Sequence, residues 1–156
     1  MAANLTEMET YLKSIRIPLR LACTTKSGWP IAISLWYQYH RGQLFCATQK
    51  TARVVSYLQD NPHCAFEIAS DLPPYCGVRG QAIARIDEKI GAEILEQLLV
   101  RYLGDTNNTL SRNLLAKRQH EVAIILKPVN VYKWDFSSRM KDVIPPMLEL
   151  ADKLCP

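Results

Sequence analysis

Short strand-like segments follow one another along this chain, and few of them are separated by a helix. They show alternating apolar and polar residues or short apolar runs, both typical of β-strands. The predicted strands are Leu19–Thr24, Trp29–Tyr39, Leu44–Ala47, His63–Ala69, Tyr75–Ile86, Glu121–Lys127 and Val129–Asp135. Parallel strands need long crossover connections, so directly joined strands favour antiparallel pairing. We therefore predict a mainly β fold, an antiparallel barrel of roughly six to seven strands with helices at its ends.

Three helices accompany these strands. The first is amphipathic and lies within residues 1–17. A short second helix follows Thr51, whose hydroxyl group is predicted to cap it. A longer third helix follows Asp87, its predicted cap, and ends at Gly104. Residues 136–156 form a C-terminal tail, which contains apolar residues compatible with a loose helix.

The length and composition are those of one globular domain. The chain has 156 residues, of which 48% are hydrophobic and 22% charged, so one domain spans residues 1–156. The net charge is +4, but Lys and Arg are scattered, so no nucleic-acid-binding arm is predicted. No long apolar run predicts a membrane span. The start of the chain is too polar for a signal peptide, and we expect a cytoplasmic protein.

The cysteines and histidines predict neither a disulfide framework nor a metal site. The five cysteines include no Cys-x-x-Cys pair, and four of them lie in or beside apolar strand-like segments: Cys23, Cys46, Cys64 and Cys76. This pattern favours reduced, buried thiols in a cytoplasm. The three histidines are isolated, and none stands at metal-ligand spacing from Cys or a carboxylate. The sequence also lacks a P-loop, a dinucleotide glycine fingerprint and a Gly-x-Ser-x-Gly elbow.

The most informative local pattern is a cation-rich turn between a strand and the short helix. Lys50 stands just before the predicted helix, and Arg53 lies in its first turn. A helix N-terminus already presents free N–H groups and the positive end of the helix dipole. Cations there are unfavourable unless an anion lies between them, so the turn suggests a phosphate site. The alternative is that both side chains point into water.

Two of the predicted strands carry small residues that allow a close approach. Ala32 and Ser34 alternate with Ile33, which leaves room for a flat group against the backbone or for packing against a neighbouring strand. Gly77 and Gly80 lie inside another strand, where glycine marks a bulge or a close contact with a second backbone.

Four segments, taken in order, resemble the pyridoxamine 5'-phosphate oxidase-like, FMN-binding split-barrel superfamily. They are Ser27–Tyr37, Gly42–Arg53, Leu58–Pro62 and Val78–Ala82. Their order and spacing carry the resemblance, which extends over most of the chain. The resemblance implies a split β-barrel, a homodimer with flavin in a groove at the subunit interface, and an FMN-dependent oxidoreductase acting on a small molecule.

The resemblance also implies, by position, which residues contact the cofactor. One strand would run along the flavin ring, the next strand would border it, and the cation-rich turn would hold the phosphate. The implied cofactor-binding residues are Ala32, Ile33, Ser34, Cys46, Ala47, Thr48, Lys50, Thr51 and Arg53. Because the flavin N5 would exchange the hydride, the resemblance implies no catalytic side chain.

Four further residues are candidates for a substrate pocket: Trp36, Tyr75, Arg79 and Trp134. The alternatives are core or interface packing for the aromatic side chains and a surface ion pair for Arg79. Arg139 is the only arginine in the tail and has no histidine beside it, unlike in pyridoxamine phosphate oxidases, so oxidation of vitamin B6 is not implied. Alternative functions are a deazaflavin-dependent reductase on the same fold, a non-catalytic flavin- or haem-binding protein, and a cofactor-free interaction module.

Overall fold

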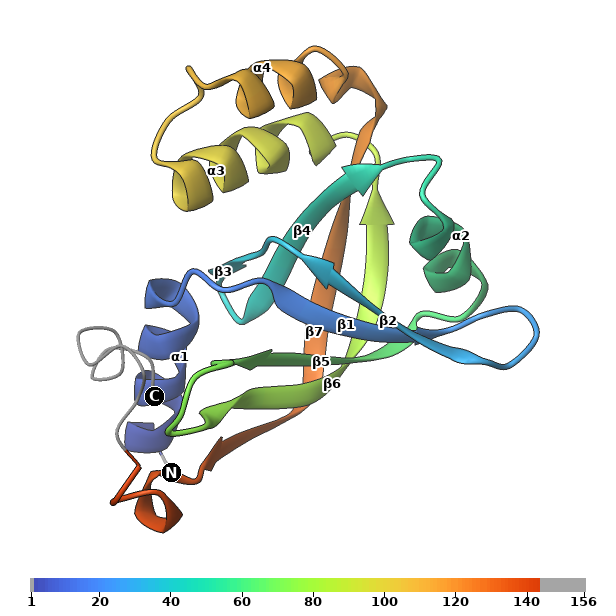
Figure 1. Cartoon of the computed structure of the whole chain (residues 1–156). Coiled ribbons are helices and arrows are strands. Elements are labelled where there is room, and N and C mark those ends of the chain that lie inside the picture. Colours follow the sequence, from blue (N-terminus) through green and yellow to red (C-terminus); the bar gives the residue numbers. More distant parts are fainter. Residues whose placement is uncertain (1, 144–156) are drawn as a thin grey trace.

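The computed structural model of the chain describes residues 2–143 (Figure 1). At its centre is one seven-stranded sheet in which neighbouring strands are antiparallel. The strands are β1 (Leu19–Thr24), β2 (Pro30–Leu35), β3 (Gln38–His40), β4 (Gln43–Gln49), β5 (His63–Ala69), β6 (Cys76–Asp87) and β7 (Glu121–Asp135). Their order in the sheet is β2-β1-β5-β6-β7-β4-β3. The predicted mainly β, antiparallel class with peripheral helices is confirmed.

The sheet curls because two consecutive strands lie at its opposite edges. β2 pairs with β1, β3 pairs with β4, and only Trp36 and Tyr37 separate β2 from β3. The two edges are therefore held near each other, as in a split barrel. The prediction of one continuous strand over Trp29–Tyr39 is wrong, because the Tyr37 backbone N–H donates to the Tyr102 hydroxyl group at 3.2 Å.

β6 and β7 form the longest pairing in the sheet. The two strands predicted on either side of Pro128 are in fact one strand, β7. The proline is tolerated because the register with β6 shifts between Gln81 and Ala82, and a bulge removes the need for a ladder hydrogen bond. The close approach predicted at Gly80 is confirmed, since an added Cβ would collide with the Asn130 carbonyl oxygen.

The interior of the barrel holds the main hydrophobic core. Its fully buried side chains include Leu19, Leu21, Tyr37, Leu44, Ile68, Val78, Ile124 and Leu126. Cys23, Cys46 and Cys64 are free and buried, and burial raises the pKa of all three thiols, which keeps them protonated and weakly nucleophilic. Cys76 is disulfide-bonded, so the expectation of a reduced thiol is wrong at that position.

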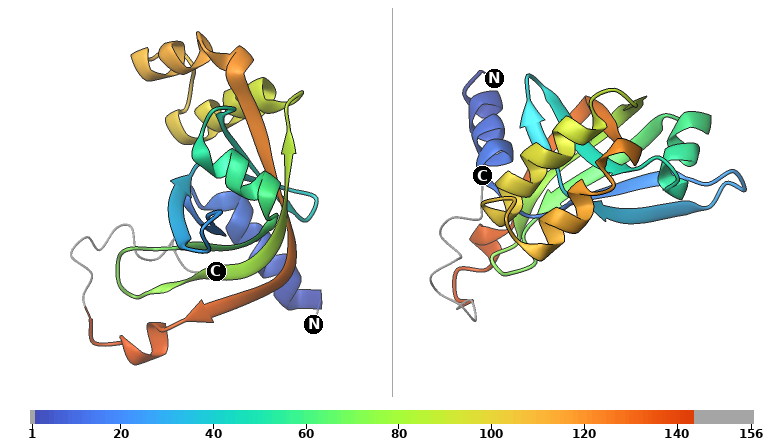
Figure 2. Two further views of the ribbon diagram at one scale, coloured as in Figure 1. Left: turned by 90° about the vertical axis from the view of Figure 1, so that its right-hand side faces the viewer. Right: turned by 90° about the horizontal axis from the view of Figure 1, so that it is seen from above.

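The helices lie around the barrel. They are α1 (Ala2–Ser14), α2 (Arg53–Asp60), α3 (Gly91–Leu103) and α4 (Thr109–Leu115), with short 3-10 turns η1 (Arg118–His120) and η2 (Ser137–Arg139). Figure 2 shows α3 and α4 together at one end of the molecule, while the β1–β2 hairpin projects from its side. Within the described residues, no helix has the length and apolar character needed to cross a membrane. The helix predicted in the C-terminal tail lies beyond Val143 and so outside the described residues.

Both predicted helix caps need correction. Ala52 is the N-cap residue of α2, and no side chain caps that helix, so the prediction of Thr51 as the cap is wrong. Asp87 lies one turn before α3, whose N-cap residue is Ile90. The Asp87 carboxylate accepts a hydrogen bond from the Lys89 backbone N–H at 3.0 Å, so it closes the turn that leads into the helix.

α3 covers one part of the outer face of the sheet. Its residues Ile94 and Leu98 form a second apolar cluster with Ala123 and Ile125 of β7, and residues of β4 pack against it. Over β2, β1, β5 and β6 the outward-facing side chains are exposed or half-buried. The outer face is therefore covered in one part and open in the other.

Candidate functional site

A groove with a volume of ≈ 500 Å³ lies on the open part of the outer face. It crosses five strands, from β2 through β1, β5 and β6 to β7. Opposite residues of paired strands point to the same side of a sheet, so the register defines rows of side chains across the strands. The first row, called here the floor row, is Ala32, Ala22, Ala65, Gln81 and Asn130. The second, called the charged row, is Ser34, Arg20, Glu67, Arg79 and Tyr132.

The floor row is flat over three adjacent strands. Ala32, Ala22 and Ala65 carry nothing beyond Cβ, and neighbouring strands lie about 4.8 Å apart. Three strands thus provide a shallow floor about 10 Å wide, the scale of a fused aromatic ring system. At the end of this floor, Asn130 Nδ2 donates to Gln81 Oε1 at 3.0 Å. The groove can therefore accept a flat group against the sheet.

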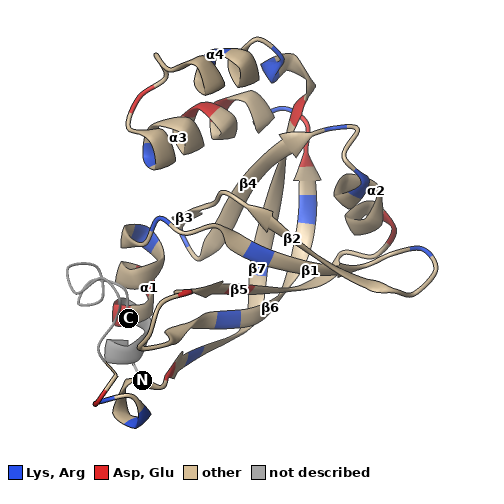
Figure 3. Ribbon diagram, in the orientation of Figure 1, with Lys and Arg blue, Asp and Glu red and all other residues tan. Residues whose placement is uncertain are grey.

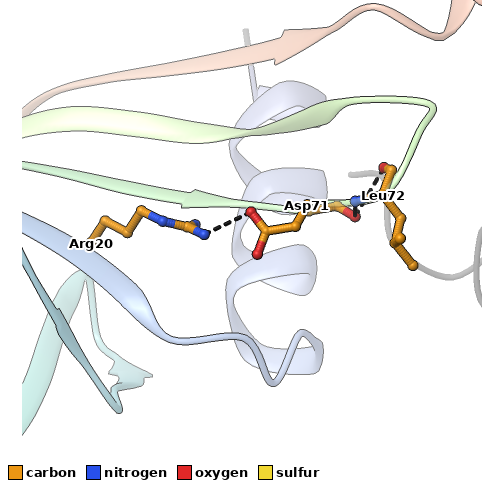
Figure 4. Close-up of polar contacts among 4 residues, drawn as sticks. Arg20, Asp71 and Leu72 are labelled. Atoms are coloured by element: carbon orange, nitrogen blue, oxygen red, sulfur yellow. Dashed lines mark hydrogen bonds and ion pairs between the residues drawn. The ribbon is translucent and has the colours of Figure 1, made fainter.

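The charged row runs beside this floor. Arg20 Nη2 donates to Asp71 Oδ1 at 2.7 Å, so a carboxylate already partners this arginine (Figure 4). Glu67 and Arg79 lie directly opposite each other on β5 and β6, yet neither forms an ion pair with a described residue. Tyr132, which is 58% exposed, ends the row. Figure 3 shows that basic residues lie on both β1 and β6.

The strands predicted to flank a flavin point their side chains in different directions. Ala32 and Ser34 face outward from β2, and Ala32 lines the groove, whereas Ile33 packs against the barrel core. On β4, Cys46 is fully buried inside the barrel and Ala47 packs against the cluster under α3. Of these residues, Ala32 lines the groove, and Cys46 and Ala47 do not.

The cation-rich turn lies where β4 passes into α2. Lys50 Nζ contacts Glu88 Oε2 at 2.7 Å, so a carboxylate already partners this cation. Arg53 begins α2, is exposed, and has no ion-pair partner in the described part of the chain. Thr51 is exposed beside it, and Thr48 is half-buried near the end of β4. The Val55 N–H already donates to the Ala52 carbonyl oxygen at 3.0 Å, which leaves the backbone amides of Arg53 and Val54 and the Arg53 side chain available to an anion.

Of the four residues predicted for a substrate pocket, Arg79 is the one that lines the groove. Trp36 stacks on Tyr102 with ring centroids 5.0 Å apart and packs against the cluster under α3, which agrees with the packing interpretation. Tyr75, which is 41% exposed, lies just before β6. Trp134 lies near the end of β7, and its Nε1 is buried without a hydrogen-bond partner in the described part of the chain.

Sequence reasoning missed several groove residues. The alternation of β1 and β5 does place Arg20 and Glu67 on the face opposite the core, so this part of the signal is present in the sequence. What aligns them with Arg79 and Tyr132 is the pairing of four strands. That register depends on contacts between distant segments, which one sequence does not reveal.

These residues fit a flavin in two separate places. The alanine floor suits the flat ring, because the floor-row residues of β1, β2 and β5 are alanines. The start of α2 suits a phosphate group, because the Arg53 side chain and the backbone amides of Arg53 and Val54 have no partner in the described part of the chain. The two places do not share one cavity, since neither Lys50 nor Arg53 lines the groove.

Comparison with solved structures identifies the fold. The chain is similar to a conserved hypothetical protein, Rv2991, from Mycobacterium tuberculosis, with a TM-score of 0.71 and 19% identity over 91% of this chain and 89% of that one. It is similar to an F420 reductase, with a TM-score of 0.68 and 18% identity over 80% of this chain and 94% of the other. A putative pyridoxamine 5'-phosphate oxidase from Listeria innocua gives a TM-score of 0.60 and 14% identity, over 86% of this chain and 97% of that one.

Comparison by sequence adds no closer assignment. No protein-family model matches the chain, and no curated protein matches its sequence. These three structures are each less than a fifth identical to the chain, so they define the architecture and not the chemistry. On this evidence the chain has the fold of the pyridoxamine 5'-phosphate oxidase-like split barrels.

Proposed function

We propose that the chain is a flavin-dependent oxidoreductase that binds FMN and acts on a small molecule as a homodimer. The observation that supports this most is the open groove with its floor of three alanines. A floor without side chains leaves space for a flat ring, and the groove lies on a fold shared with an F420 reductase and a putative pyridoxamine 5'-phosphate oxidase.

Different residues of the chain would contact the ring and the phosphate of FMN. The alanine floor and the β2 backbone at Ile33 and Ser34 would lie along the ring. Lys50, Thr51 and Arg53 would bind the phosphate at the start of α2, so the bound FMN would extend out of the groove to reach them. Cys46, Ala47 and Thr48 would contribute through the β4 backbone, because two of their side chains point into packed clusters. When bound, FMN supplies hydride transfer at its N5 atom, so no protein nucleophile is needed.

A second copy of the chain would complete the site. The groove is shallow and open to solvent on one chain, and hydride transfer is favoured where water is excluded. In the proposed homodimer the second copy covers the open part of the sheet and closes the groove over the ring. Sedimentation analysis of the purified protein should therefore give the mass of a dimer.

Two alternatives remain within the same fold. Similarity to an F420 reductase supports a deazaflavin as the cofactor. The acidic tail of a deazaflavin favours an extended basic surface, however, and the charged row interrupts its two arginines with Glu67. A protein that binds flavin or haem without catalysis is the second alternative.

The first test is an absorbance spectrum of the purified protein, with mass spectrometry of whatever heat releases. We expect the bands of oxidised flavin and the mass of FMN. A deazaflavin spectrum would replace FMN with the first alternative. A colourless protein that also fails to bind added FMN would remove the flavin assignment altogether.

The phosphate-binding role has its own test. Lys50→Ala together with Arg53→Ala should reduce FMN binding at least tenfold, because charge-assisted hydrogen bonds to the phosphate are lost. The matched control is Lys26→Ala with Arg16→Ala, which also removes one ion-paired and one unpaired surface cation. Unchanged FMN affinity in the first double variant, measured by fluorescence titration, would exclude this turn as the phosphate site.

A further inference from the structure

The charged row contains one cation that no described residue neutralises. Asp71 holds the guanidinium group of Arg20. Arg79 has neither an ion-pair partner nor a side-chain hydrogen bond in the described part of the chain, although Glu67 stands opposite it. Arg79 also lines the groove. It is therefore the residue of this row whose N–H donors are available to a bound molecule.

The neighbours of Arg79 define the kind of molecule that suits the position. A guanidinium group offers two parallel N–H donors, which match the two oxygens of a carboxylate. Tyr132 lies directly opposite Arg79 and is 58% exposed, so its ring can stack on an aromatic ring. Gln81, two residues from Arg79, belongs to the floor row, so a flat molecule held by Arg79 also reaches the floor.

Glu67 restricts the charge of that molecule. It faces the groove directly beside Arg79 on the neighbouring strand. A negative charge at this position lowers the affinity for any anion, and the penalty grows with the charge of that anion. Arg79 beside Glu67 should therefore bind a carboxylate, with one negative charge, more tightly than a phosphate group, with nearly two negative charges.

We propose that Arg79 binds the carboxylate of a planar aromatic monocarboxylic acid, whose ring lies on Tyr132 and the edge of the alanine floor. Identifying this acid as the substrate rests on the proposed function, but its binding does not. Arg79 is thus a substrate-binding residue, and Glu67 selects against more highly charged anions.

Benzoate and benzamide are suitable probes because they share one ring and differ in charge. Each is titrated into the full chain free of flavin, and binding is followed by the ¹H–¹⁵N signals of the arginine Nε–H groups. We expect benzoate to bind at least tenfold more tightly than benzamide and to shift the Arg79 signal. Equal affinities for the two probes would overturn the proposal.

Variants then locate the binding site. Arg79→Gln should weaken benzoate binding at least tenfold and leave benzamide unchanged, while Arg79→Lys should keep part of the affinity. The control is Arg85→Gln, which removes another exposed arginine of β6, one that is paired with Asp87 at 2.8 Å. Glu67→Gln should increase the affinity for phenyl phosphate more than that for benzoate. Unchanged benzoate binding in Arg79→Gln would refute the assignment, and a simultaneous loss of the dimer would place Arg79 at the subunit interface instead.

This test and the flavin test fail in different ways. The benzoate titration uses protein without flavin, so a colourless protein that still binds benzoate through Arg79 would retain the carboxylate site and lose the oxidoreductase. A protein that binds FMN but not benzoate would retain the flavin assignment and lose the carboxylate site.

Discussion

The outer face of the sheet has two regions, one covered by α3 and one that carries the open groove. Under α3 this face carries large apolar side chains such as Phe45 and Ile125, together with the small side chain of Ala123, and the helix covers them. Over β2, β1, β5 and β6 it carries alanines together with charged residues, and no described side chain fills the groove above them. Both regions belong to one antiparallel sheet, and they differ in their outward-facing side chains.

In the covered region the chain packs its own helix α3 on the sheet, and in the open region it leaves space for another molecule. Burying a large apolar side chain is worth about 1.5–3 kcal/mol, enough to hold a helix against the sheet. An alanine buries too little area to do this, and a charged side chain costs free energy if it is covered without a partner. The open region is therefore stable without a cover, and a ligand or a second copy can bind there.

The largest effect is expected where the packing between α3 and the sheet is weakened. Leu98 of α3 is 1% exposed and packs between the helix and the sheet, in a cluster with Ala123 and Ile125. Leu98→Ala should therefore lower the free energy of unfolding by about 3 kcal/mol. Val100→Ala on the same helix is the control, because Val100 is 50% exposed. The measurement is urea denaturation followed by circular dichroism. Equal losses in both variants would mean that α3 does not depend on this packing.

The open region should respond in the opposite way. Ala65→Leu places a large side chain on the floor of the groove, so FMN binding should weaken about tenfold while stability changes by no more than about 0.5 kcal/mol. Ala116→Leu makes the same change at the exposed C-cap residue of α4. The readouts are a fluorescence titration with FMN and the urea midpoint. A large loss of stability with unchanged FMN affinity would show that the floor is part of the packed structure and not a binding surface.

Much of this arrangement could be predicted from the sequence, because it depends on local pattern. The alternation along β1 and β5 separates core residues from outward ones, and small residues in β2 mark its exposed face. The start of α2 was also predicted, although its cap was not. In each case the physical cause lies within a few neighbouring residues.

The remainder depends on partners far away in the chain. β2 and β3 separate because Tyr37 bonds to Tyr102, 65 residues later, and Trp36 stacks on the same side chain. Lys50 pairs with Glu88, which lies 38 residues away in the chain. This carboxylate offsets part of the positive charge of the turn. The rows of the groove likewise need the register of five strands. No local pattern encodes such contacts.

The smallest effect that we expect concerns a carboxylate at the edge of the covered region. Glu121 begins β7, is 6% exposed, and accepts a hydrogen bond from the Gln49 side chain. Burial raises the pKa of Glu121 above its usual value of 4.5, and the Gln49 hydrogen bond opposes this shift. The folded chain therefore holds this proton more tightly than the unfolded chain, and stability falls as pH rises from about 4.5 through the raised pKa.

Glu121→Gln removes this ionisation while keeping an oxygen that can accept the Gln49 hydrogen bond. Its advantage over the wild type should be absent at low pH, should grow through that interval, and should then stay constant up to neutral pH. Gln49→Ala should have the opposite effect, because it removes the hydrogen bond that stabilises the ionised carboxylate. The test is to measure the urea midpoints of the wild type and both variants from pH 4 to pH 8. Parallel curves for Glu121→Gln and the wild type would mean that the carboxylate is hydrated in the folded chain, and that the cover provided by α3 ends before the start of β7.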